Sequence, residues 1–254
     1  LASSIMSKKL AEGISGLLLD VKCGSGAFMK DIGSARLLAQ TLVRIGNAMS
    51  VGCRAFITNM NQPIGWAVGN ALEIKESIEI LKGGGPADTL ELVVAFGGWM
   101  LHAGGKAESE EHGAEMIRDA IADGSGAEIF KRLIKAQGGN PEIVDNPDLM
   151  PSAVHEHEFK AEDEGYIESF DAEAMGMALV LLGGGRLKKE DSIDPSVGFR
   201  VHKKIGDFAK KGDAIFTVYY NDERKLEDSL AKLKGCVKFS PKNPDFTLIL
   251  EKFE

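Results

Sequence analysis

Cysteine is scarce in this chain of 254 residues. The three cysteines, Cys23, Cys53 and Cys236, are odd in number, lie far apart and form no Cys-x-x-Cys pair. A disulfide framework needs paired cysteines, and a zinc–thiolate site needs closely spaced ones. The sequence therefore argues against both as leading interpretations. It favours a reducing compartment, and we expect a cytoplasmic protein.

Long apolar runs and an excess of basic residues are also missing. No apolar run approaches the ~20 residues of a membrane-spanning helix, and nothing resembles a secretory signal. The net charge is -8, whereas a nucleic-acid-binding protein needs a basic face to neutralise phosphates. We therefore expect no membrane and no nucleic-acid partner. With 44% hydrophobic and 27% charged residues, the composition is that of an ordinary globular protein.

The first part of the chain has the pattern of an α/β unit. Leu17–Val21 is a nearly continuous apolar run, typical of a parallel strand, and Arg54–Thr58 predicts a second strand. Apolar residues recur at helical spacing over 35–49, between the two strands. Ligands of such sheets bind beyond the carboxyl ends of the strands, where the Gly24–Met29 turn and the 59–63 loop lie. The glycine-rich turn could cradle a phosphate through its amides, or its glycines could serve only a tight turn.

The sequence pattern of the rest of the chain changes near residue 150. Helical patterns cover 69–137, and a stretch rich in Gly, Asn and Pro follows over 138–147. Short strands and turns then alternate with two expected helices, at 172–182 and 223–234. We predict an α/β protein: a parallel-sheet lobe with covering helices over 1–150, and a smaller C-terminal α+β domain over 151–254.

Three weaker motifs have ordinary explanations. His155 and His157 could be a metal pair, but a surface strand is the simpler interpretation, since no third ligand is near. The glycines of 183–186 could form an anion nest, although a glycine helix stop is simpler. Asp207 and Asp213, each following a glycine, are expected to form turns.

Ser4 and Lys8 are the main candidate site residues. The segment 1–13 reads as a helix, and residues four apart share a helix face, so a hydroxyl and an ammonium can address one polar ligand. Taken alone, such a pair is more often a solvated helix face, because Ser and Lys are mostly exposed.

The surrounding residues resemble one enzyme family. Residues 4–9 (Ser-Ile-Met-Ser-Lys-Lys) and 20–29 (Asp-Val-Lys-Cys-Gly-Ser-Gly-Ala-Phe-Met) are similar to the pyrimidine-nucleoside and thymidine phosphorylases. The resemblance extends from Leu1 to the C-terminus, and the helix at 1–13 matches the last helix of the family's helical lobe. It implies that Ser4 and Lys8 are catalytic and bind the pyrimidine base. It also implies that Ile5 and Phe28 line the base pocket, the alternative for these two being plain core.

A second block, Asn61–Glu76, resembles the pyrimidine-nucleoside branch of that family. There the matching residues coordinate a potassium ion, so the resemblance implies that Ile64 and Ala67 contribute backbone carbonyls and Glu76 a carboxylate. Hard oxygen ligands suit such a cation. The alternative is a helix-opening loop followed by an exposed Glu76. The block favours a pyrimidine-nucleoside phosphorylase of broad substrate specificity, and strict thymidine phosphorylase is the alternative.

The resemblance also implies what the chain does not contain. Residue 1 is Leu, and about the first two-fifths of the family's subunit precede the matching position. That portion holds most of the N-terminal helical lobe, the phosphate loop with its Lys-His-Ser-Thr-Gly-Gly motif, and a base-binding arginine. The family converts pyrimidine nucleoside and phosphate to free base and pentose 1-phosphate as a homodimer, without an organic cofactor. We expect the isolated chain to be inactive. The alternative of another class is a non-catalytic fragment or interaction remnant.

Overall fold

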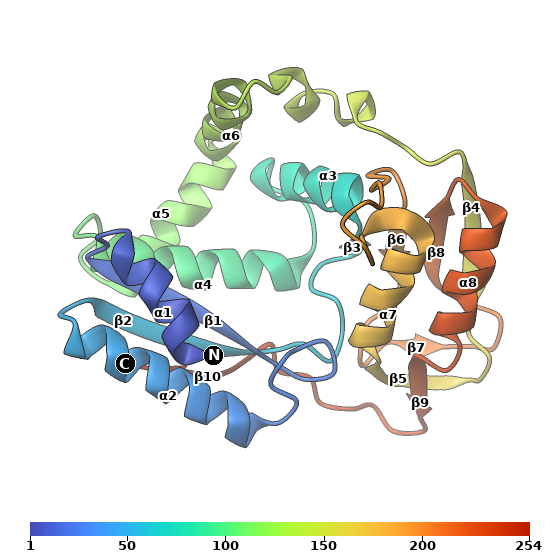
Figure 1. The fold of residues 1–254 in the computed structure, drawn as a ribbon, viewed down its shortest axis with the longest axis horizontal. Helices are drawn as coiled ribbons and strands as arrows, with labels where there is room; N and C mark the ends of the chain where they lie inside the picture. The colour runs from blue at the N-terminus through green and yellow to red at the C-terminus, as the bar shows by residue number, and fades with distance from the viewer. The chain divides into compact units, whose positions relative to one another are not determined.

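The computed structural model describes all 254 residues, Leu1–Glu254 (Figure 1). The chain is a mixed α/β protein, as predicted, and it divides into two compact units. The first consists of Leu1–Met60, Asp88–Ala120 and Thr247–Glu254, and the second of Asn61–Ala87 and Ile121–Phe246. The units interleave along the chain, whereas the expected division at residue 150 is sequential. No helix has both the length and the apolar character that a membrane span requires.

The helices are α1 (Ala2–Ala11), α2 (Ile32–Ala48), α3 (Asn70–Leu81), α4 (Ala87–Ala103), α5 (Glu110–Ala122), α6 (Ser125–Ala136), α7 (Ala172–Leu179) and α8 (Glu223–Leu233). Short 3-10 helices span Pro141–Val144 and Pro147–Leu149, and a π-helical turn spans Val180–Gly184. The strands are β1 (Gly16–Cys23), β2 (Gly52–Asn59), β3 (Ala67–Val68), β4 (His155–Lys160), β5 (Gly165–Phe170), β6 (Gly198–Val201), β7 (Phe208–Ala209), β8 (Ala214–Tyr220), β9 (Val237–Ser240) and β10 (Ile249–Phe253).

The sheet of the first unit has the order β1-β2-β10 (Figure 1). β1 and β2 are parallel, in register from Gly16 opposite Gly52 to Cys23 opposite Asn59, with α2 between them in the chain. This confirms the predicted strand–helix–strand unit. β10 was expected in the C-terminal domain, but it pairs antiparallel with β2 and so makes the sheet mixed. β2 is nearly fully buried, and a buried strand needs backbone partners on both edges.

Helices cover both faces of this sheet (Figure 1). On one face, alternate residues of β1 pack with Met6 of α1 and with Ala35, Ala39 and Leu42 of α2. The two alanines lie four residues apart and are fully buried, so α2 approaches the sheet closely. On the other face, Phe96 of α4 contacts Phe56 of β2 with ring centroids 5.0 Å apart.

The second unit holds two antiparallel sheets, ordered β3-β6-β8-β4 and β7-β5-β9. The two sheets share one apolar core with α7 and α8. The fully buried aromatic residues of this core are Phe170, Phe199 and Phe216, all from strands. A smaller cluster of Ile78, Ala127 and Val144 joins α3 to α6 and the first 3-10 helix. The unit therefore has the mixed strand-and-helix texture that was predicted after residue 150.

Several local predictions are confirmed in the second unit. Gly183 adopts φ +105° in the turn that ends α7, as a glycine helix stop requires. The carboxylates of Asp207 and Asp213 accept hydrogen bonds from the amides three residues earlier, at 2.7 and 3.0 Å, so both form turns. The strand β4, which carries His155 and His157, is mostly exposed, as predicted for a surface strand.

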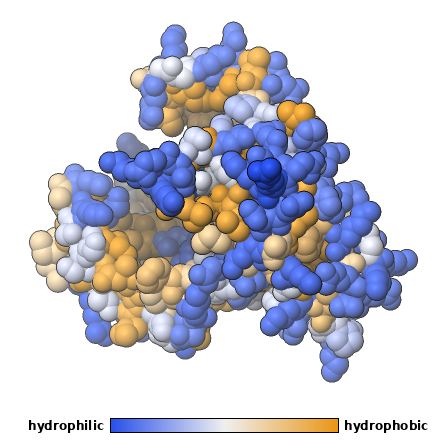
Figure 2. Space-filling model, turned by 45° about the vertical axis from the view of Figure 1, so that its right-hand side comes forward, coloured by the Kyte–Doolittle hydropathy of each residue, from blue (hydrophilic) through white to orange (hydrophobic).

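Some large apolar side chains reach the surface, where orange patches interrupt the hydrophilic areas of the face in Figure 2. Among the exposed ones, Leu37 and Met100 belong to helices of the first unit, and Phe28 belongs to its glycine-rich turn. Phe28 is the most exposed of them, and it is one of the candidate site residues.

Candidate active site

Helix α1 separates its apolar and polar side chains. Met6 is 1% exposed, and Ile5 is half-buried against the same core cluster. Ser4 and Lys8 are both exposed, one helical turn apart. Lys8 lies in the last turn of α1, where a cation also interacts favourably with the helix dipole. The side chains of Ser4 and Lys8 are thus accessible to a ligand. The position of Ile5 is compatible both with a base pocket and with the core.

The two strand ends that were expected to hold ligands are joined to each other. The amide of Met60, just after β2, donates to the carbonyl of Cys23 at 2.7 Å, and the amide of Gly26 donates to the carbonyl of Met60 at 2.9 Å. The amides of Gly24 and Ala27 donate to carbonyls within the turn, each at 3.0 Å. The amides of Gly24, Gly26 and Ala27 in the turn are therefore already used, so the structure favours a tight turn over a phosphate cradle.

Phe28 projects from this turn with 85% of its surface exposed. The plain-core interpretation of Phe28 is therefore wrong, because a core phenylalanine would be buried. Its exposed ring could contact a flat ligand, and a role in lining a base pocket remains a prediction.

A polar cluster that sequence analysis missed lies on the α4-facing side of the sheet. Asp20 and Lys22 of β1 form an ion pair at 2.5 Å, and the hydroxyl of the fully buried Thr58 donates to Asp20, also at 2.5 Å. The sequence did carry a sign of this cluster, because Asp20 and Lys22 interrupt an otherwise apolar strand. Residues two apart in a strand lie on the same face of the sheet. The cluster lies in the carboxyl halves of β1 and β2.

In the second unit, Glu76 lies within α3 and is only 7% exposed. Its Oε2 accepts hydrogen bonds from the amides of Trp66 at 2.7 Å and of Ala67 at 2.9 Å. The alternative of an exposed Glu76 is therefore wrong. In a β-strand, the N–H and C=O of one residue point to the same side, so strand geometry predicts that the carbonyl of Ala67 lies on the same side of β3 as its amide, which donates to Glu76.

Lys204 contacts the same loop, which sequence analysis did not anticipate. Its Nζ donates to the carbonyl of Pro63 at 2.5 Å and also to the carbonyl of Gly65. Next to it, the amide of Ile205 donates to Oε1 of the buried Gln62 at 2.8 Å. About 140 residues of chain separate the partners, so no local pattern could have predicted the contact.

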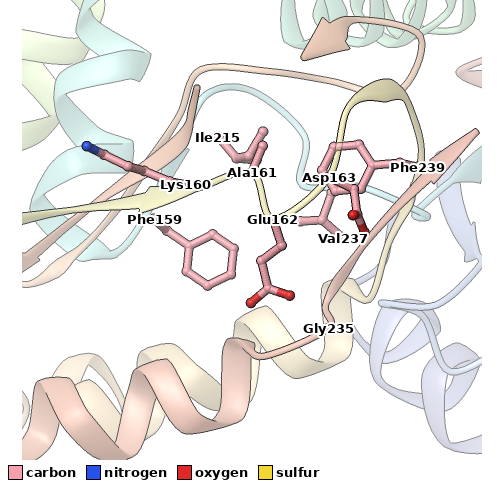
Figure 3. A pocket seen from close by; sticks show the side chains of 9 residues that line it. All are labelled: Phe159, Lys160, Ala161, Glu162, Asp163, Ile215, Gly235, Val237 and Phe239. Atoms are coloured by element: carbon pink, nitrogen blue, oxygen red, sulfur yellow. The ribbon is translucent and has the colours of Figure 1, made fainter. Parts of the chain in front are cut away.

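Two cavities of the structure lie apart from these groups. Figure 3 shows one of about 40 Å³ in the second unit, bordered by the ring of Phe159 and the carboxylates of Glu162 and Asp163. It can hold a few water molecules but is far below the roughly 300 Å³ of a typical ligand pocket. A larger cavity of about 460 Å³ in the first unit includes Lys9 and Trp99, but it lies at the amino end of β1.

Two family models match the chain. "Glycosyl transferase family, a/b domain" matches residues 2–127, and "Pyrimidine nucleoside phosphorylase C-terminal domain" matches residues 166–240. The second match falls within the second unit, on the strand-rich segment that includes α7 and α8.

Curated relatives match nearly the whole chain. Proteins named pyrimidine-nucleoside phosphorylase from Geobacillus stearothermophilus and Staphylococcus epidermidis are 44% and 45% identical over 240 and 249 residues. A relative of the same name from Staphylococcus aureus is 43% identical over 249 residues. The alignments cover 94–98% of this chain. The chain spans 55–57% of the length of these relatives.

Proposed function

Because the chain belongs to the pyrimidine-nucleoside phosphorylase family, we propose that it is the larger part of an enzyme that cleaves pyrimidine nucleosides with phosphate. A phosphate oxygen bonds to C1′ of the sugar, and the bond from C1′ to the base nitrogen breaks. The base departs with the bonding electrons, so the products are free base and pentose 1-phosphate. Negative charge grows on the base as it leaves, and donors aimed at the base stabilise that transition state.

The observation that carries this proposal is the arrangement of α1. The helix buries Met6 in the core and leaves Ser4 and Lys8 exposed on one side. In our proposal, the Lys8 ammonium stabilises the charge that develops on a base carbonyl. The Ser4 hydroxyl hydrogen-bonds the base edge and fixes its orientation, with Ile5 and Phe28 as apolar neighbours of the base.

The finer assignments are also proposals. We propose that uridine and thymidine are both substrates and that the complete enzyme is a homodimer. Strict thymidine phosphorylase is the alternative, and comparing kcat/KM for the two nucleosides decides between them. Because the matched relatives are longer, we expect this chain alone to lack turnover.

A bound potassium ion is part of the proposal, and the residues present fit one. Glu76 supplies a buried carboxylate beside the 62–67 loop, and we expect the carbonyl of Ala67 on the same side of β3 as the amide that donates to Glu76. Ile64 belongs to the same loop and could add a third oxygen, and oxygen ligands suit a hard monovalent cation. The bound ion would supply a fixed positive charge that holds the loop.

The test uses the completed chain, in which the upstream portion of one matched relative precedes Leu1. We expect the completed chain to release uracil from uridine in the presence of phosphate, with turnover on the order of 10 per second. The 254-residue chain alone should show almost none in the same ultraviolet assay. A folded completed chain that neither turns over uridine nor binds uracil would contradict the proposal and favour the non-catalytic alternative.

A further inference from the structure

Two charged side chains hydrogen-bond the backbone of the loop at residues 62–67. Carbonyls of Pro63 and Gly65, both buried residues, accept hydrogen bonds from the Lys204 ammonium. Further along the loop, the amides of Trp66 and Ala67 donate to the Glu76 carboxylate. Buried backbone groups need partners, and this loop finds them in one cation and one anion.

Lys204 is itself held in place. Its amide donates to the Asp207 carboxylate at 2.7 Å, within the turn that precedes β7. The adjacent amide, that of Ile205, donates to Oε1 of Gln62 in the loop. The half-buried lysine therefore extends from a hydrogen-bonded turn that is attached to the loop at a second point, and its ammonium donates to the two loop carbonyls.

We propose that Lys204 is a positioning residue that acts as a built-in monovalent cation for the 62–67 loop. An ammonium group resembles a potassium ion in charge and size, and both bind backbone carbonyl oxygens. The loop then keeps its order when free cations are scarce, and a potassium ion can replace the ammonium at the carbonyls of Pro63 and Gly65 when Lys204 is substituted. This inference concerns the loop at which we propose a potassium site, but it does not depend on phosphorolysis.

The test is hydrogen exchange at the amides of Trp66 and Ala67, the two that donate to Glu76. It compares the unaltered chain with Lys204→Met, which keeps an unbranched side chain but removes the charge. Each is measured in potassium chloride and in N-methyl-D-glucamine chloride at equal ionic strength, because the second cation is too large to bind the loop. The matched control is Lys203→Met, whose ammonium contacts the carbonyl of Phe208 instead.

In N-methyl-D-glucamine chloride, exchange should be about tenfold to a hundredfold faster in Lys204→Met, since hydrogen bonds to charged groups are the stronger ones. Potassium chloride should restore most of that protection. The unaltered chain and Lys203→Met should exchange slowly in both salts. Lys204→Gln is the second variant and should show the same dependence on potassium.

Three results would overturn the inference. Unchanged exchange in both Lys204 variants would show that the ammonium does not hold the loop. Lost protection or lost folding that potassium does not restore would show an ordinary structural contact. An equal gain from potassium in the unaltered chain and in the variants would place the ion apart from the ammonium. Because no activity is measured, failure of the proposed phosphorolysis would leave each outcome interpretable.

Discussion

The side chains of Ser4 and Lys8 contribute little to the packing of the fold. Both are exposed, whereas Met6 on the same helix is buried in the core. Exposed side chains of this kind can usually be changed with little effect on stability. Substitutions at these two positions therefore separate a role in catalysis from a role in folding.

In the completed chain, Lys8→Ala should lower kcat for uridine phosphorolysis by about 10²–10³, the typical cost of losing one electrostatic donor to a developing charge. Lys9→Ala is the matched control, because Lys9 lies on the same helix and pairs with Glu12. Steady-state kinetics of the two variants provide the measurement. Equal rates would remove Lys8 from the mechanism.

Ser4→Ala should lower kcat/KM by about tenfold, less than Lys8→Ala, because a neutral hydrogen bond contributes roughly 0.5–1.5 kcal/mol. Alanine is a better helix former than serine, so the thermal midpoint should not fall. Measuring kcat/KM and the thermal midpoint together checks this. An unchanged kcat/KM would identify Ser4 as part of a solvated helix face.

At the scale of elements, β3 and β6 pair closely at Gly198 in the second unit. A Cβ at Gly198 would collide with the carbonyl of Val68 on the paired strand and lie 2.8 Å from Leu72 of α3. Gly176, in α7, has nothing within 4 Å of the corresponding position. The two glycines therefore differ in what a methyl group would meet, although both lie in regular elements.

Gly198→Ala should destabilise the fold by about 1–3 kcal/mol, because overpacking forces neighbouring backbone to shift. Gly176→Ala should stabilise it by about 0.5–1 kcal/mol, because alanine is favoured in an exposed helix. Urea unfolding of both variants measures the change in the free energy of unfolding, which should be negative for Gly198→Ala and positive for Gly176→Ala. A neutral Gly198→Ala would mean that β3 and β6 separate without cost.

For the whole molecule, the reactivity of the three cysteine thiols measures how well the folded structure excludes solvent. Cys23, Cys53 and Cys236 are free thiols, all of them buried. Burial raises the pKa of each, and for Cys236 desolvation together with the nearby Asp171 carboxylate raises the pKa to about 12. A raised pKa means less thiolate at a given pH, and the thiolate is the reactive form.

At about pH 8, an aromatic disulfide reagent should label the native thiols at least about a hundredfold more slowly than those of the urea-unfolded chain. Lys211→Cys places a thiol on an exposed residue and is the control for reagent access. Absorbance of the released thiolate follows the reaction. Rapid labelling of Cys236 in the native protein would show that the second unit opens readily.

Local sequence determined the elements of this protein. The apolar run of Leu17–Val21 and the helical spacing over 35–49 predicted β1 and α2, because a strand or helix depends on neighbouring residues. The glycine at 183 likewise ended a helix as predicted. Ser4 and Lys8 could be paired because helix geometry alone places residues four apart on one face.

Only the tertiary structure decided which distant segments meet. β10 pairs with β2 although about 190 residues separate them, and Lys204 contacts the carbonyls of Pro63 and Gly65 across about 140 residues. The sequence likewise could not show that Glu76 is buried or that Phe28 is exposed. Such contacts depend on which buried strand edges and carbonyls lack local partners, and that is settled only when the whole chain has folded.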